Sequence, residues 1–276
     1  MSPPLRSLAR VAAASLLSMA FCLPAPYPPL LAEEGKERGA DDPAYACSDN
    51  AHLGRLSAPL ARMRRLIAAR RPVTIMALGS SSTAGAGASS PAASYPARLE
   101  VELRNRFPGV SITVVNRGVN GEEAADMLAR FDQTAAADKP DVVLWQLGTN
   151  AVLRDHPLGP VDRLITEGLM RMKALDVDVV LIDPQFAPKV LARPDADSMV
   201  GVIATTSTNR GVDLFQRFAV MREWHEAGAI PFEAFLSPDL LHMNDWGYAC
   251  LAKLLGAAMA EAATRPVAAA RTITSK

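Results

Sequence analysis

Residues 73–79 read Val-Thr-Ile-Met-Ala-Leu-Gly, and Ser80-Ser81-Ser82-Thr83 follows them directly. The first segment is a short uncharged run rich in apolar and β-branched residues, which predicts a strand buried on both faces. The second segment is a turn of hydroxyl residues, which is typical of a tight loop or of the start of a helix. A buried strand that ends in such a turn favours an α/β domain, in which ligands bind beyond the carboxyl ends of the strands.

The same alternation continues along the rest of the chain. From Arg71 onward, short apolar runs alternate with longer amphipathic runs, which is the pattern of a parallel sheet covered by helices on both faces. We expect strands at residues 73–79, 111–116, 141–147, 177–183 and 211–215. We expect helices at residues 60–70, 94–107, 122–131, 160–175, 195–208 and 245–263. The pattern therefore predicts one α/β domain with a parallel five-stranded sheet.

The first 32 residues differ in composition from the rest of the chain. Arg6 and Arg10 precede an apolar run over residues 11–23, and four prolines follow it. This run is shorter than the roughly 20 residues that a bilayer-spanning helix needs. We predict that residues 1–32 are a signal peptide cleaved after Ala32, that the protein is periplasmic or secreted, and that it has no stable membrane anchor.

The chain has three cysteines, of which Cys22 lies in the predicted signal peptide. In an exported protein the remaining two, Cys47 and Cys250, are expected to form a disulfide, because the compartments outside the cytoplasm are oxidising. The alternative is that Cys250, which lies among alanines and a leucine, is only a small buried apolar residue.

Charge and motif content exclude several classes of function. Lys and Arg number 29, as do Asp and Glu, so the formal net charge is zero and nucleic acid is not an expected partner. The stretch Gly79–Gly87 lacks the lysine of a phosphate-binding loop, and Ser90 stands where a dinucleotide-binding fingerprint requires its last glycine or alanine. His-Glu-x-x-His and clustered Cys/His patterns are missing from the sequence, so we expect neither a metal nor another cofactor.

The residues after the predicted strands form a short list of candidates for chemistry. They are Gly79 to Thr83, Asn116 to Gly121, Gly148 to Asn150, and the later segment Asp239 to His242. A serine hydroxyl becomes a nucleophile when a base takes its proton, and His242 with Asp239 three residues earlier supplies such a base. Glycine N–H groups and an asparagine amide are suitable donors to an oxyanion. These residue types indicate acyl transfer by a serine nucleophile.

Together these four segments resemble, in order, the four sequence blocks of the SGNH or GDSL-type serine hydrolases. The resemblance covers residues 72–260 and implies a flavodoxin-like three-layer α/β/α sandwich. It implies that Ser81 is the nucleophile, with Asp239 and His242 as its acid–base partners. It also implies an oxyanion hole formed by the N–H groups of Ser81 and Gly121 and by the side chain of Asn150. The predicted organisation is then the signal peptide, an N-terminal extension with a helix at 33–70, the hydrolase domain at 71–264 and a tail at 265–276.

The sequence departs from the family pattern at four positions beside the predicted pocket. Ser80 replaces the usual aspartate, Ser82 the usual leucine, Ala151 a frequent aspartate and Leu240 a frequent glycine. These changes remove no predicted catalytic group, but they leave the identity of the substrate open.

Two of the predicted oxyanion donors have simpler explanations. Gly121 can serve only to permit a positive φ, and Asn150 can serve only as a helix cap. Gln146, Trp145 and Trp246 are expected to pack in the core rather than to contact substrate.

Three functions are compatible with these residues. The first is an exported esterase that hydrolyses an O-acyl ester of a small molecule or a glycan through an acyl-enzyme on Ser81, with a carbohydrate ester as the favoured substrate. The second is a periplasmic O-acyltransferase that passes the acyl group to a glycan hydroxyl. The third is a non-catalytic module that binds glycan or lipid.

Overall fold

The computed structural model describes residue 47 and residues 51–265, which all belong to the second of the two units of the chain, Arg38–Lys276. The predicted signal peptide at residues 1–32 lies outside the described residues, as does the predicted tail beyond Arg265.

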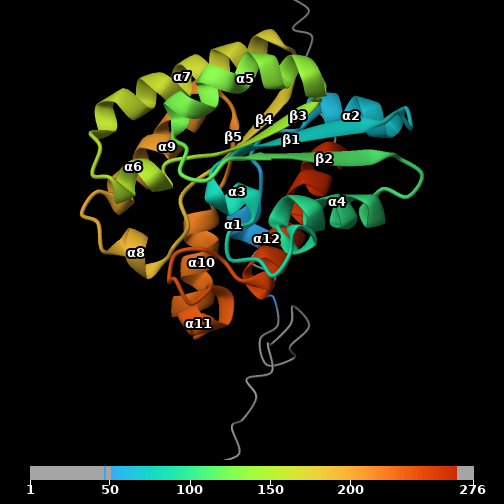
Figure 1. The fold of residues 1–276 in the computed structure, drawn as a ribbon. Coiled ribbons are helices and arrows are strands. Elements are labelled where there is room, and N and C mark those ends of the chain that lie inside the picture. Colours follow the sequence, from blue (N-terminus) through green and yellow to red (C-terminus); the bar gives the residue numbers. More distant parts are fainter. Residues whose placement is uncertain (1–46, 48–50, 266–276) are drawn as a thin grey trace, which may run out of the picture. The chain divides into compact units, whose positions relative to one another are not determined.

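The centre of the fold is a parallel sheet whose strand order is β2-β1-β3-β4-β5 (Figure 1). The strands are β1 (Val73–Gly79), β2 (Ile112–Gly118), β3 (Val142–Gln146), β4 (Asp178–Ile182) and β5 (Asp213–Phe215). Every neighbouring pair runs parallel. This is the flavodoxin-like order, so the predicted fold class is confirmed.

The burial of each strand explains why the apolar runs predicted it. All of β3 is buried, as is β1 except for Thr74, because both strands lie inside the sheet with helices on each face. By contrast, the edge strand β2 alternates between buried, partly buried and exposed positions. It also runs two residues beyond the predicted end at Asn116, since Arg117 and Gly118 still pair with the last residues of β1.

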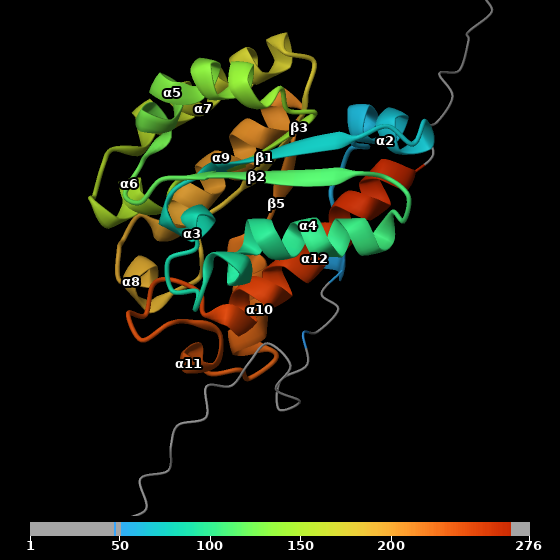
Figure 2. The same ribbon diagram turned by 45° about the vertical axis from the view of Figure 1, so that its right-hand side comes forward.

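Helices cover both faces of the sheet and complete the three layers (Figures 1 and 2). On one face α4 (Tyr95–Arg106) lies beside α12 (Asp245–Thr264), and on the other lie α5 (Ala124–Asp138), α7 (Leu158–Ala174) and α9 (Ala196–Arg210). These helices fall at five of the predicted positions, and α2 (Ala61–Ala68) lies within the sixth. Because α5 begins with a capping box between Glu123 and Asp126, it starts two residues later than predicted.

One full helix was not predicted from the sequence, namely α10 (Arg217–Glu226). Its buried residues Phe218, Met221 and Trp224 recur every three positions and form one face, so a periodic signal was present in the sequence. The short elements of the structure are α1 (Ala51–Gly54), α3 (Ser81–Ala84), η1 (Pro91–Ala93), α6 (Thr149–Leu153), α8 (Pro188–Leu191) and α11 (Phe232–Phe235). Among the residues that the structure describes, no helix combines the length and apolar character needed to cross a bilayer.

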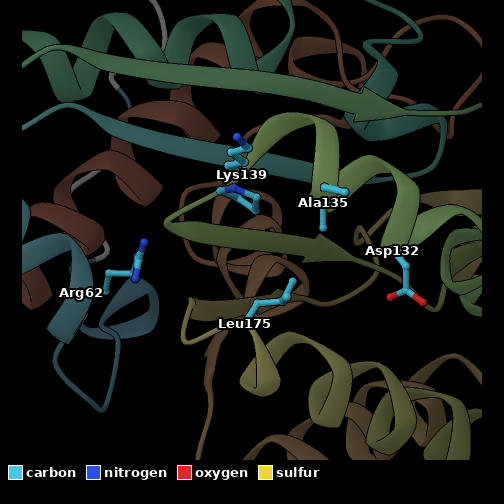
Figure 3. A pocket seen from close by; sticks show the side chains of 7 residues that line it. Arg62, Asp132, Ala135, Lys139 and Leu175 are labelled. Atoms are coloured by element: carbon cyan, nitrogen blue, oxygen red, sulfur yellow. The ribbon is translucent and has the colours of Figure 1, made fainter.

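An open pocket of about 500 Å³ lies at the amino ends of the strands (Figure 3). It lies between α2 and α5, and its lining includes Lys139 and Pro140, which precede β3. The guanidinium of Arg62 at its edge is held by Asp141, with 2.8 Å between Nε and Oδ1. Parallel sheets bind their ligands at the opposite, carboxyl end, so this pocket is remote from the predicted site.

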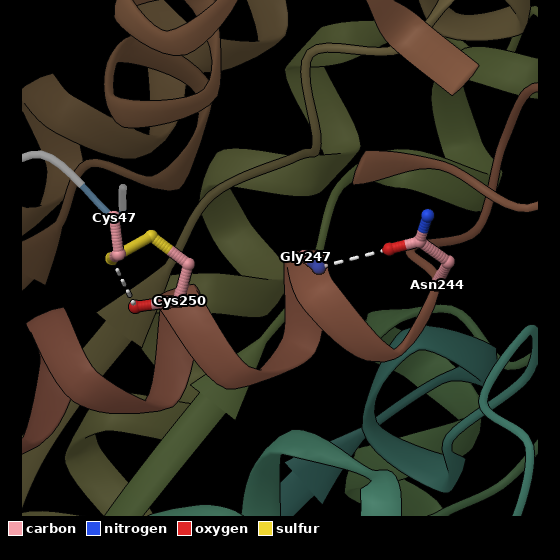
Figure 4. Close-up of a disulfide and its surroundings, with 4 residues drawn as sticks. All are labelled: Cys47, Asn244, Gly247 and Cys250. Carbon is pink, nitrogen blue, oxygen red and sulfur yellow. Dashed lines mark hydrogen bonds between the residues drawn. A yellow bond between two sulfur atoms is a disulfide. The ribbon is translucent and has the colours of Figure 1, made fainter. Parts of the chain in front are cut away.

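A disulfide joins Cys47 to Cys250 in the second turn of α12 (Figure 4). The sulfur atoms are 1.95 Å apart, and the predicted pairing is therefore present in the structure. Because the bond links residues separated by 203 positions, loop-closure entropy predicts a stabilisation of about 5 kcal/mol. It fastens the N-terminal segment to the helix that begins just after His242. That helix is capped by Asn244, whose side chain accepts the N–H of Gly247 at 3.0 Å.

Candidate active site

Ser81 is the first residue of α3, immediately beyond the carboxyl end of β1. The sheet order places β2 on one side of β1 and β3 on the other, so the chain reverses its direction of winding at this point. Loops that follow β1 and β3 diverge at such a switch point, and ligands of open α/β sheets bind in the crevice between them. The candidate nucleophile therefore lies where the fold favours a ligand.

The structure brings Ser81, His242 and Asp239 together. Nε2 of His242 lies 2.8 Å from the Ser81 hydroxyl, and Nδ1 of the same ring lies 2.5 Å from Oδ2 of Asp239. The carboxylate can only accept, so Nδ1 carries the proton, and in the neutral ring Nε2 then accepts from the serine hydroxyl. This is the orientation in which an imidazole can remove the proton of a serine nucleophile.

The loop of residues 237–242 fixes the carboxylate before any substrate arrives. Oδ1 of Asp239 accepts hydrogen bonds from the Ser237 hydroxyl at 2.7 Å and from the N–H groups of Leu241 and His242, each at 2.9 Å. Partial burial alone would raise the pKa of Asp239. The hydrogen bonds from His242, Ser237 and Leu241 outweigh burial and hold that pKa well below its usual range. Asp239 therefore stays anionic and keeps the imidazole in the required tautomer.

Of the three consecutive serines, only Ser81 contacts the histidine. Ser80 and Ser82 are buried, and both the hydroxyl and the N–H of Ser80 donate to the side-chain oxygen of Gln146, at 3.1 and 3.0 Å. The same oxygen accepts from the Thr83 hydroxyl at 3.2 Å. Gln146 is buried, as expected, but its side chain fixes the nucleophile turn rather than only packing.

Two glycines let β1 and β2 approach this turn closely. A Cβ on Gly118 would lie 2.1 Å from the backbone nitrogen of Ala84, and a Cβ on Gly79 would lie 2.1 Å from the hydroxyl of Thr83. No side chain fits at either position, because real Cβ atoms do not come within 3.0 Å of such atoms. The short helix that carries Ser81 is thus packed directly against the end of β2.

The predicted oxyanion donors lie on the loops after β2 and β3. Gly121 has a φ of +80°, and its own carbonyl accepts from Arg154, so its backbone is held in a conformation that favours glycine. Asn150 lies inside α6, and its amide donates to the Glu122 carbonyl at 2.8 Å. One amide hydrogen of Asn150 thus fixes the Gly121 loop, and the second is left to donate elsewhere. Within the described residues, neither the Ser81 nor the Gly121 N–H has an acceptor.

Backbone contacts connect these loops to the nucleophile turn. The Val119 N–H donates to the Gly79 carbonyl at 3.0 Å, which ties the loop after β2 to the end of β1. Arg154 clamps the same loop from the other side, because it donates to the Gly121 carbonyl at 2.8 Å and pairs with Glu123. Sequence reasoning missed Arg154, since an exposed arginine one turn after the Gly-Thr-Asn block carries no distinctive pattern.

Two other histidines, His156 and His225, have side-chain partners other than Ser81 and Asp239. His156 pairs with Glu123 at 2.9 Å, and His225 lies 3.0 Å from the Ile230 carbonyl and stacks on Phe232. Trp145 is fully buried and donates to the sulfur of Met127, as expected for a core residue.

Similar proteins of known sequence include two esterases. A segment of 64 residues, 23% of this chain, is 36% identical to an acetylxylan esterase of Geobacillus stearothermophilus. A segment of 85 residues, 31% of this chain, is 34% identical to an arylesterase of Vibrio mimicus. The chain spans 29% and 40% of the length of these two relatives.

Similar folds occur in solved structures of esterases. A two-domain esterase active on acetylated mannans, crystallised with mannopentaose, has a TM-score of 0.64 at 21% identity, and the match covers 78% of this chain and 57% of that one. The acetylxylan esterase of Geobacillus stearothermophilus has a TM-score of 0.57 at 21% identity, covering 68% and 94%. A putative lipolytic protein of the G-D-S-L family from Desulfitobacterium hafniense has a TM-score of 0.56 at 20% identity, covering 69% and 99%.

A family match covers most of the chain, from residue 46 to residue 265. The predicted kinship with the SGNH and GDSL-type hydrolases is confirmed by this match together with the shared fold. In the first block of this chain, Ser80 and Ser82 flank the predicted nucleophile Ser81. This chain belongs to the non-GDSL lipase-like family.

Proposed function

We propose that this protein is a serine esterase that hydrolyses an O-acyl ester, with Ser81 as the nucleophile. The observation that carries the proposal is the continuous hydrogen-bonded chain from Ser81 through His242 to Asp239, with the serine at the switch point of the sheet. The names of the similar proteins, an acetylxylan esterase and an arylesterase, support the same class of reaction.

In the first half of the proposed reaction, the Ser81 hydroxyl attacks the ester carbonyl carbon while His242 accepts its proton. The negative charge that develops on the carbonyl oxygen is stabilised by the N–H groups of Ser81 and Gly121 and by the free amide hydrogen of Asn150. Collapse of the intermediate breaks the bond to the alcohol, which leaves with the proton from His242. Asp239 stabilises the imidazolium throughout this step.

In the second half, water replaces the alcohol and hydrolyses the acyl-enzyme. His242 removes a proton from the water, which attacks the acyl carbon and forms a second tetrahedral intermediate. The intermediate then releases the carboxylic acid, and Ser81 regains its proton from His242. The step consumes one water for each ester, and no cofactor takes part.

The proposed substrate is an acetylated carbohydrate. This finer proposal is supported by the described activities of the similar proteins, which include action on acetylated mannans and on acetylxylan. Acetate release from acetylated xylo-oligosaccharides and manno-oligosaccharides, compared with release from an aryl acetate, tests it. Hydrolysis of the aryl ester alone would argue against a carbohydrate substrate.

The decisive variant is Ser81→Ala, assayed on an aryl acetate and by labelling with a fluorophosphonate probe. We expect loss of both hydrolysis and labelling in a protein that remains folded. Ser82→Ala is the matched control, because Ser82 is the next residue of the same turn but is buried, and the described hydrogen bond to Nε2 of His242 comes from Ser81. Retained hydrolysis in the Ser81→Ala protein would refute the assignment. Analysis of the products with an acceptor glycan present then separates hydrolysis from acyl transfer.

Export is also proposed, and it depends on the composition of residues 1–32 alone. Sequencing of the amino terminus of the protein recovered from outside the cytoplasm should find cleavage after Ala32. An uncleaved chain that stays in the cytoplasm would contradict export. It would leave the proposed chemistry of Ser81 unaffected.

A further inference from the structure

Gln185 connects three parts of the candidate site. It lies three residues beyond the end of β4, is 1% exposed and forms three side-chain hydrogen bonds. Its partners come from different elements, namely Thr149 in α6, Arg217 at the start of α10, and Leu241 in the loop that carries His242. The side chain is too deeply buried to contact a substrate.

The orientation of its amide is fixed by two donors. Oε1 of Gln185 accepts from the Thr149 hydroxyl and from Nη2 of Arg217, both at 2.9 Å. Because a guanidinium can only donate, the oxygen must face Arg217 and the NH2 group must face the other way, and the Thr149 hydroxyl then donates to the same oxygen. Nε2 then donates to the carbonyl of Leu241 at 3.3 Å.

Arg217 itself has little freedom to move. Its side chain is 0% exposed, and its Nε donates to the Asp183 carbonyl at 2.8 Å. Burial lowers the pKa of Arg217 to about 10, so the guanidinium is still charged at neutral pH. A charged donor makes a stronger hydrogen bond to Gln185 than a neutral donor would.

Each end of this network lies next to a residue of the proposed chemistry. Leu241 immediately precedes the proposed base His242, and Thr149 immediately precedes the proposed oxyanion donor Asn150. A change in the Gln185 amide would therefore alter the position of both residues relative to Ser81. Displacements of about 1 Å in a catalytic group can lower a rate by about a hundredfold.

We propose that Gln185, oriented by Arg217, is a positioning residue that sets the His242 loop relative to Asn150 and Ser81. The proposal rests on the esterase function proposed above and extends it to a residue that does not contact the substrate.

The sharpest test is Gln185→Glu, which keeps the shape of the side chain. A glutamate still accepts from Arg217 and Thr149 and gives the buried guanidinium a carboxylate partner, so we expect the folded state to be retained. Its second oxygen would face the Leu241 carbonyl, and an acceptor would replace a donor there. We expect kcat for an aryl acetate to fall by about tenfold to a hundredfold, with KM within about threefold of the parent value. The rate of fluorophosphonate labelling should fall in parallel.

Two further variants keep this test decisive. Gln185→Met removes all three bonds and should lower kcat at least as much, and it replaces the glutamate variant if that protein does not fold. Thr206→Val is the matched control, because it removes a buried hydroxyl that links α9 to α7 by donating to Asp162, and none of its described hydrogen bonds involves Gln185 or the proposed catalytic residues. The control should lose stability but keep the kcat of the parent.

A folded Gln185→Glu protein with unchanged kcat would overturn the positioning role, as would a rise in KM alone. That result differs from failure of the proposed function. If Ser81→Ala retains activity, the esterase assignment falls whatever Gln185 does. If Ser81→Ala is inactive and Gln185→Glu is normal, only the positioning role is lost.

Discussion

Two polar clusters lie at the carboxyl end of the sheet, and they differ in where their charges are placed. The first, Ser81 with Asp239 and His242, lies at the surface, where the Asp239 side chain is 41% exposed. The second, Asp183 with Gln185 and Arg217, is almost completely buried. Among the described residues, both oxygens of the surface carboxylate accept hydrogen bonds, whereas Oδ2 of Asp183 and Nη1 of Arg217 have no partner.

The pKa values of the two carboxyl groups are consequently shifted in opposite directions. Hydrogen bonds hold the pKa of Asp239 below its usual range despite partial burial, whereas full burial raises the pKa of Asp183 to about 7. The exposed cluster keeps a charge that the proposed chemistry needs. Burying the charge of Arg217 costs stability, and what the buried cluster contributes is a fixed geometry.

The largest expected effect is on the surface cluster. Asp239→Asn replaces an acceptor by an amide that can donate to Nδ1 of His242, so the ring would carry its proton on Nε2 and could not take that of Ser81. We expect kcat for an aryl acetate to fall by about 10⁴-fold, together with a loss of the stability that the Asp239 carboxylate contributes at neutral pH. Steady-state kinetics beside a melting curve measures this. Asp176→Asn, an exposed aspartate at the opposite end of the sheet, should be indistinguishable from the parent.

A decrease in kcat of less than tenfold in Asp239→Asn would contradict the proposed role of the carboxylate. It would leave His242 as a base without an orienting partner.

The second prediction concerns the contribution of the buried cluster to the stability of the protein. Arg217→Met removes the donor to the Asp183 carbonyl and one of the two donors to the Gln185 oxygen, so we expect a loss of about 3–5 kcal/mol in the free energy of unfolding. Urea unfolding measures it. At pH 8, above the raised pKa of Asp183, adding Asp183→Asn removes the carboxylate charge that Arg217→Met would leave buried, and the double variant should therefore lose less than the sum of the two single changes.

Additive losses in that cycle would mean that Asp183 and Arg217 do not interact. A loss below about 1 kcal/mol from Arg217→Met would show that the buried charge is not part of what holds α10 on the sheet.

The third prediction concerns the dependence of stability on pH, which should differ in sign for Asp183 and Asp239. The folded pKa of Asp183 is raised to about 7, so its buried carboxyl stays protonated while that of the unfolded chain ionises near pH 4. Stability should therefore fall as the pH rises from about 4 to about 7, and Asp183→Asn should flatten this region. Asp239 has a lowered pKa, so the stability it contributes is present above about pH 4 and is lost at more acid pH.

Unfolding curves from pH 3 to pH 8 for the parent, Asp183→Asn and Asp239→Asn check both signs. If Asp183→Asn leaves the slope between pH 4 and pH 7 unchanged, the raised pKa is wrong.

The residues of the surface cluster could be predicted from the sequence, and those of the buried cluster could not. The sequence blocks that contain Ser81, Asp239 and His242 follow one another in a recognisable order, because the proposed reaction tolerates few residue types at those positions. The central strands were predicted for a related reason, since burial on both faces demands continuous apolar runs.

Gln185 and Arg217 gave no comparable signal. A glutamine after a strand usually lies in a solvated loop, and an arginine at the start of a helix usually lies on its exposed face. Their partners lie far away in the sequence, since Arg217 donates to Gln185 across 32 positions and Gln185 donates to Leu241 across 56. Such a contact is a property of the tertiary structure and has no periodicity in the sequence.

The smallest expected effect concerns Leu240, which lies between Asp239 and His242 in the surface cluster. Its φ is +54°, a left-handed conformation that costs a leucine roughly 1 kcal/mol and a glycine almost nothing. This explains why a glycine is frequent at this position in the resembling hydrolases. Leu240→Gly should raise the free energy of unfolding by about 0.5 kcal/mol, because the relieved strain is partly offset by the greater entropy of the unfolded chain. The value of kcat should change by less than about twofold.

Leu240→Ala is the matched control, because alanine also lacks the leucine side chain but keeps the unfavourable backbone conformation. Urea unfolding of the parent and the two variants should therefore place glycine above alanine. The reverse order would mean that the side chain, which is 36% exposed, stabilises the loop by more than its backbone strain costs. The surface cluster would then be stabilised by side-chain packing, as the buried cluster is. The two clusters would differ only in where their charges are placed.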